Sequence, residues 1–82
     1  MKITKKGTKN PFLLIKENNV QTAIKISDIS RLKLYRKQIT IMLINEYERN
    51  LYFNTEKTAE QTYYNLLDII TSISDGEKYN HD

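Results

Sequence analysis

Few side chains of this 82-residue chain could perform acid–base, nucleophilic or metal chemistry. The one histidine, His81, stands next to the C-terminal residue, and the chain contains no cysteine. A catalytic triad, or a histidine or thiolate metal site, needs several such groups held together by the fold. Gly7 and Gly76 are isolated, so neither a P-loop nor a dinucleotide fingerprint is present. We therefore expect a protein that is not an enzyme and that uses no cofactor, no metal and no small-molecule substrate.

Carboxylates in the C-terminal part of the chain are the remaining candidates for proton transfer. Glu56, Glu60 and Asp68 are spaced by multiples of four residues, which places them on one side of a predicted helix, opposite its apolar stripe. Charged residues on that side of a helix are ordinarily found there because they are exposed to water. A partner could use these acids together with Tyr64, but the spacing favours a plain solvated surface.

Side chains suited to binding gather on one face of a predicted sheet. We expect this face to carry Lys25, Arg31, Lys33, Tyr35, Met42, Ile44 and Tyr52. A single helix can cover only one side of the sheet, so the other side stays exposed. Met42 and Ile44 beside tyrosines form an apolar patch of the kind that protein interfaces use. The first hypothesis is therefore a protein-interaction module, a homo-oligomer or a small adaptor or inhibitor that docks on a partner protein.

The same face supports a second hypothesis, the binding of single-stranded nucleic acid. Its cations suit phosphates and its tyrosine rings suit stacked bases. A lysine-rich segment at residues 2–9 would add attraction that does not depend on base sequence. No specific family motif accompanies these residues. The competing explanation is that tyrosine packs well on strands and that lysine keeps an exposed sheet soluble.

The charges are distributed unevenly along the chain. Residues 1–37 contain ten Lys or Arg and two acids, a net charge of +8, whereas residues 38–82 contain three basic and eight acidic residues, a net charge of −5. The many Lys, Ile, Asn and Tyr residues are typical of an AT-rich genome, so total basicity says little about function. The asymmetry is more informative, because it predicts an electrostatically polarised molecule.

The chain is long enough for one hydrophobic core. We expect a flexible basic arm at residues 1–10, one α+β domain at residues 11–75 and a disordered tail at residues 76–82. Four or five short, mostly antiparallel strands would form one meander, at residues 11–16, 20–26, 30–35, 39–44 and 49–54. Turns are expected at Glu17–Asn19 and Arg36–Gln38, and a turn or single helical turn at Ser27–Asp28.

A C-terminal helix follows the strands and is expected to pack on one side of the sheet. Its apolar stripe comprises Ala59, Tyr63, Leu66, Ile70 and Ile73. Tyr63 belongs to this stripe and Tyr64 does not. Thr55 and Thr58 are alternative N-caps, and the helix is expected to end at about Ser74, before Gly76. No apolar run is long enough for a membrane span or a signal-peptide core, so a cytoplasmic location is expected.

Overall fold

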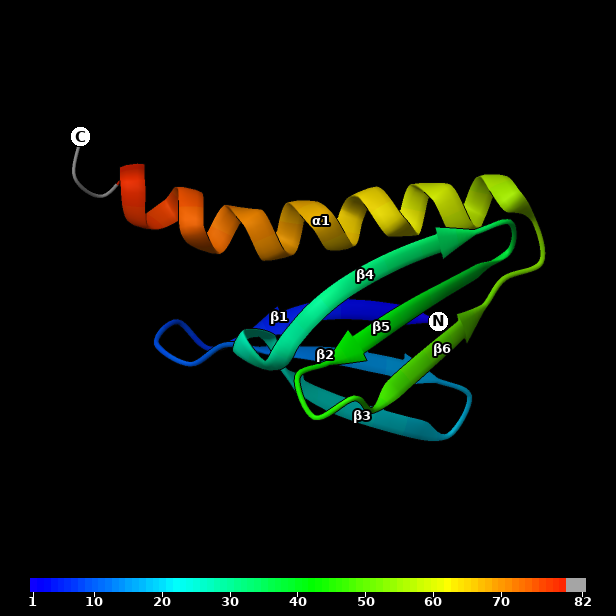
Figure 1. Ribbon diagram of the computed structural model, residues 1–82, viewed down its shortest axis with the longest axis horizontal. Helices are drawn as coiled ribbons and strands as arrows, with labels where there is room; N and C mark the ends of the chain where they lie inside the picture. The colour runs from blue at the N-terminus through cyan, green and yellow to red at the C-terminus, as the bar shows by residue number, and fades with distance from the viewer. Residues whose placement is uncertain (80–82) are drawn as a thin grey trace. The chain divides into compact units, whose positions relative to one another are not determined.

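The computed structural model describes the backbone of residues 1–79 and side chains through Thr71. Strands, a short 3-10 helix and a long α-helix follow one another along the chain (Figure 1). Their bounds are β1 Lys2–Lys6, β2 Phe12–Glu17, β3 Val20–Lys25, η1 Ile26–Asp28, β4 Ile29–Tyr35, β5 Gln38–Leu43, β6 Glu48–Tyr52 and α1 Glu56–Tyr79. The α+β class expected from the sequence is confirmed. Residues 80–82 of the expected tail lie outside the described residues.

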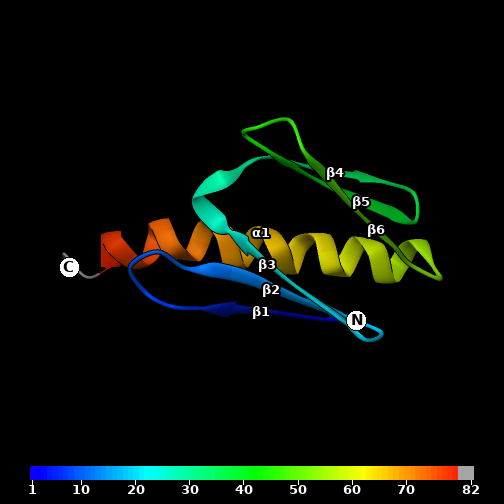
Figure 2. The same ribbon diagram turned by 90° about the horizontal axis from the view of Figure 1, so that it is seen from below.

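The strands form two antiparallel sheets rather than the single meander that the sequence predicts. One sheet has the order β1-β2-β3 and the other the order β4-β5-β6 (Figure 2). The interruption is η1, which ends β3 with a buried Ile26 before β4 begins. Here the Ile26 amide donates to the Pro11 carbonyl, and the Ile44 amide donates to the Asp28 carbonyl. The expected single helical turn is therefore present, and a new sheet begins after it.

The N-terminal segment is a strand, which corrects the expected flexible arm. Lys2–Lys6 pairs along its whole length with β2, from Lys2 opposite Lys16 to Lys6 opposite Phe12. Ile3 is its one apolar side chain, and it lies opposite the fully buried Ile15. Backbone pairing of this kind requires no hydrophobic alternation, which explains why a polar segment can add to an existing hairpin.

The chain divides into two compact units, Met1–Leu32 with Ile41–Arg49 and Lys33–Thr40 with Asn50–Asp82. The first unit contains the β2–β3 hairpin, in which Glu17 pairs with Val20 around a two-residue turn. Asn18 has a φ of 56°, a left-handed conformation that asparagine tolerates. The buried side chains of this unit are Leu13, Ile15, Ile24, Ile26 and Ile41.

The second unit contains α1 and parts of β4, β5 and β6. Among its side chains as far as Thr71, those that are buried are Ile39, Leu51, Ala59 and Leu66. Tyr63 is half-buried and Tyr64 is 57% exposed, which confirms the predicted helix phase. The Thr58 amide donates to the Thr55 hydroxyl at 3.1 Å, so Thr55 is the N-cap.

The C-terminal end of α1 differs from the expectation. The helix continues past Ser74 and Gly76 to Tyr79. A glycine inside a helix costs only about 1 kcal/mol relative to alanine, so its presence does not by itself end a helix. Within the described residues, no helix combines the length and apolar character needed to cross a membrane.

Candidate functional site

The exposed face of β4, β5 and β6 in the second unit carries the best-formed candidate site. Arg36–Lys37 is a two-residue turn between Tyr35 and Gln38, so those two residues lie opposite each other and Lys33 lies opposite Thr40. The Phe53 amide donates to the Lys37 carbonyl at 2.9 Å. In this antiparallel register Gln38 lies opposite Tyr52, and Thr40 lies opposite Asn50. We call this surface the tyrosine face, and its members are Lys33, Tyr35, Gln38, Thr40, Asn50 and Tyr52.

A hydrogen-bonded network occupies the middle of the tyrosine face. The Gln38 side-chain amide donates to Thr40 Oγ1 at 3.3 Å and to Asn50 Oδ1 at 3.1 Å, and the Thr40 hydroxyl donates to the same Asn50 oxygen at 2.8 Å. All three side chains are half-buried. The Gln38 carbonyl oxygen and the Asn50 amide nitrogen are not among the buried unpaired atoms of the described residues. The network therefore fixes three polar side chains and leaves an acceptor and a donor for a partner.

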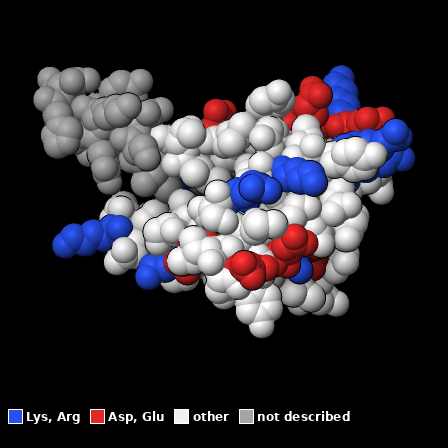
Figure 3. Space-filling view, viewed as in Figure 1, with Lys and Arg blue, Asp and Glu red and all other residues white. Residues whose placement is uncertain are grey.

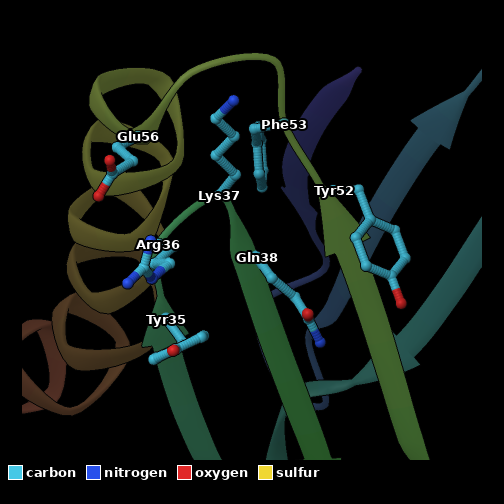
Figure 4. A pocket seen from close by; sticks show the side chains of 7 residues that line it. All are labelled: Tyr35, Arg36, Lys37, Gln38, Tyr52, Phe53 and Glu56. Atoms are coloured by element: carbon cyan, nitrogen blue, oxygen red, sulfur yellow. The ribbon is translucent and has the colours of Figure 1, made fainter.

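Two exposed tyrosines flank this network. Tyr35 is 62% exposed and Tyr52 is 66% exposed, and Figure 4 shows Gln38 between them. The Arg36 guanidinium lies 5.7 Å from the centre of the Tyr35 ring, within the range of a cation–π contact. Rings held at the surface on both sides of a fixed amide can contribute a large contact area with little loss of side-chain freedom.

A depression of about 430 Å³ opens at the end of the tyrosine face that carries these rings (Figure 4). Its lining residues are Tyr35, Arg36, Lys37, Gln38, Tyr52, Phe53 and Glu56. Three aromatic rings, two cations, one amide and one carboxylate thus surround a space large enough for one or two side chains of a partner. The mixed charge matters, because Glu56 would repel an anion that Arg36 and Lys37 attract.

Of the residues that the sequence predicts on one face, one lies in the other sheet. Lys25 lies on β3, in the other sheet, so it does not share a face with the rest. Arg31, Lys33 and Tyr35 lie on β4, Met42 on β5, Ile44 in the following loop and Tyr52 on β6. Met42 is half-buried and Ile44 is 66% exposed, and both belong to the first unit. The structure brings Lys33, Tyr35 and Tyr52 together in the second unit.

The other residues that line the depression were missed by the sequence analysis. Gln38 is the first residue of β5, Phe53 directly follows β6, and Glu56 is the first residue of α1. The signal for Gln38 and the turn residues was available, since a two-residue hairpin turn places its flanking residues opposite each other. The position of Glu56 depends on where the helix begins. The sequence did not decide this, because Thr55 and Thr58 were alternative N-caps.

Basic and acidic side chains both reach the surface. Groups of both signs can be seen on the face drawn in Figure 3. Among the described residues, no group of three or more His, Cys, Asp or Glu side chains is placed to hold a metal ion. The arrangement on the tyrosine face is suited to recognition through rings, amides and charges of both signs.

Comparisons with known proteins give no relative for this chain: no family model, no curated protein and no solved structure matches it.

Proposed function

We propose that this chain is a non-enzymatic protein-interaction module that associates with a second copy of itself through the tyrosine face. One observation carries the proposal: two tyrosines that are 62% and 66% exposed lie on either side of a fixed, half-buried amide. Tyrosine is enriched in the buried centres of protein interfaces and is costly to leave in water over a large area.

The face is compatible with its own copy. A two-fold axis along β5 would lay Tyr35 over Tyr52 of the second copy and Lys33 over Asn50 of the second copy. No cation of the tyrosine face then lies over another cation, and Thr40 lies next to its own equivalent. A two-fold interface must be self-complementary in this way.

Charge on the surrounding surface favours a protein partner over a polyanion at this site. Arg36 and Lys37 share the depression with Glu56. A partner protein can match charges of both signs, whereas a phosphate backbone would meet the carboxylate. Nucleic-acid binding through this same face, the second hypothesis from the sequence, has less support for that reason.

The contact would be weak. Six side chains form the tyrosine face, whereas a stable interface of standard size uses roughly 20–30 residues on each side. We expect a dissociation constant on the order of 100 µM, in the range of transient contacts. Self-association would also help a chain of 82 residues, whose core is small.

Sedimentation velocity over a range of protein concentrations tests the proposal. The wild type should shift from the mass of one chain toward the mass of two as the concentration approaches the millimolar range. Tyr52→Asp should remain monomeric throughout, because a carboxylate would be buried against the partner. The chain offers a matched control in Tyr47→Asp, since Tyr47 is 70% exposed in the β5–β6 loop and belongs to the first unit.

Two results would contradict the proposal. One is a wild type that stays monomeric at millimolar concentration. The other is an equal loss of association in Tyr52→Asp and Tyr47→Asp, which would mean that added negative charge, and not the tyrosine face, controls association.

A further inference from the structure

The outward face of the β1-β2-β3 sheet is a regular array of side chains in three rows across the strands. The rows are Lys2, Lys16 and Gln21, then Thr4, Leu14 and Ala23, then Lys6, Phe12 and Lys25. Side chains alternate between the two faces of a strand, so all nine share one side. The exposure of these side chains agrees with their placement on one side of the sheet. Leu14 is half-buried and the other eight are exposed, whereas Leu13 and Ile15 on the opposite side are fully buried. We call this surface the lysine face.

Four lysines occupy the lysine face and no acidic residue does. Lys2 and Lys16 lie directly opposite each other on neighbouring strands. Like charges in such cross-strand positions are destabilising. An anion bound between the two ammonium groups would remove that repulsion. The lysine face is therefore better suited to binding an anionic ligand than to contact with water alone.

A small depression of about 150 Å³ marks where an anion would sit. Its lining residues are Lys2, Thr4, Leu14, Lys16 and Gln21, all members of the lysine face. Two ammonium groups, one hydroxyl and one amide therefore surround an apolar floor formed by Leu14. The volume corresponds to about five water molecules at liquid density, enough for a phosphate group.

The remaining row adds features of a nucleic-acid surface. Phe12 is 40% exposed and stands between Lys6 and Lys25 on the neighbouring strands. Four residues along a strand span about 13 Å, so this row lies about 13 Å from the Lys2–Lys16 pair. An exposed ring between two cations offers a base a surface for stacking.

We propose that the lysine face binds the phosphate backbone of single-stranded nucleic acid, with a phosphate between Lys2 and Lys16 and a base against Phe12. A single strand fits because its bases are free to stack on a ring, whereas those of a duplex are stacked on one another. A membrane surface fits less well, because membrane binding buries a large apolar surface and Phe12 is the one large apolar side chain that is exposed on the lysine face. The proposal does not depend on association through the tyrosine face.

Fluorescence anisotropy with a labelled oligothymidine, repeated at several salt concentrations, tests the proposal. The wild type should bind at low salt and lose affinity as salt rises. Lys16→Gln should weaken binding several-fold and reduce the slope of log affinity against log salt by about 0.7, the value for one lost contact to a single strand. Phe12→Leu should weaken binding about tenfold and leave the salt slope unchanged, because stacking releases no counterions.

Lys5→Gln is the matched control, since Lys5 is exposed, lies on the same strand as Lys2 and points to the opposite face. It removes the same charge and should leave both affinity and slope near the wild-type values. Lys2→Gln provides a second test of the same phosphate contact if Lys16→Gln does not fold. The proposal is overturned by the absence of binding at low salt. It is also overturned by equal losses in Lys5→Gln and Lys16→Gln, or by binding to anionic lipid vesicles but not to the oligonucleotide.

Discussion

Lys2 and Lys16 lie directly opposite one another on β1 and β2, without an acidic residue on the same face of the sheet. Replacing Lys16 by Glu converts a repulsive cross-strand pair into an attractive one. We expect Lys16→Glu to raise the free energy of unfolding by about 0.5 kcal/mol and the thermal midpoint by about 2–4 °C, because opposite charges in this position are favourable. The same substitution should abolish oligonucleotide binding.

Thermal denaturation of the free protein at low salt checks this prediction. Lys5→Glu serves as the control, since Lys5 lies opposite Leu13 and gains no cation directly across the strand. A destabilised Lys16→Glu variant, or an equal gain in the control, would show that the Lys2–Lys16 register does not govern stability in this sheet.

The start of α1 gives a second prediction. Thr55 accepts a hydrogen bond from the Thr58 amide, whereas Thr58 is inside the helix. Thr55→Ala should therefore lower the free energy of unfolding by about 1 kcal/mol. Thr58→Ala should cost less, because alanine is a better helix former and the backbone amide keeps its acceptor. Urea denaturation of both variants checks which substitution is more destabilising. A larger loss of stability in Thr58→Ala would contradict the assignment of Thr55 as the N-cap.

The network on the tyrosine face gives a third prediction. Asn50 Oδ1 accepts from both Gln38 and Thr40. Asn50→Ala leaves two half-buried donors without their acceptor and should cost about 1–2 kcal/mol in urea denaturation. Asn54→Ala is the matched control, since Asn54 is exposed and lies just beyond β6, and its effect should stay within about 0.5 kcal/mol. Equal effects would mean that the network contributes nothing to stability.

The ion pair of the first unit gives a fourth prediction. Arg49 Nη2 and Glu17 Oε1 are 3.5 Å apart, and each side chain is about one-third exposed, at 33% and 32%. Arg49 Nε is buried without a hydrogen-bond partner. A pair this long and this exposed contributes little, whereas a buried unpaired N–H is unfavourable. Arg49→Met should therefore leave the urea midpoint unchanged or raise it, and a clear fall would contradict this reading of the pair.

The sequence predicted those parts of the fold that depend on local patterns. The helical stripe placed Tyr63 and Tyr64 correctly, and turns occur within the predicted segments Glu17–Asn19 and Arg36–Gln38, although Glu17 and Gln38 themselves belong to strands. These features follow from periodicity and turn chemistry, which are readable within a few residues. The class was predictable for the same reason.

Features that depend on pairing between distant segments were not predictable. Lys2–Lys6 contains one apolar residue, Ile3, and forms a strand through backbone pairing with β2. Backbone hydrogen bonds do not require particular side chains, so this strand cannot be recognised from its composition. Without β1 there is no row that brings Lys2 to Lys16. The division into two sheets at η1 likewise removed Lys25 from the predicted face. In both cases the sequence shows which residue types are present, but not which residues lie next to them in the folded chain.

Association through the tyrosine face is tested most directly by cross-linking at Thr40, because a two-fold axis along β5 places this residue next to its own equivalent. The natural chain has no cysteine, so Thr40→Cys introduces a single thiol. Facing sheets lie about 10 Å apart, which a short bis-maleimide can span and a disulfide cannot. Lys57→Cys, on the exposed first turn of α1, is the control. Thr40→Cys should form covalent dimers much faster than Lys57→Cys at the same concentration, and equal rates of cross-linking would contradict association through the tyrosine face.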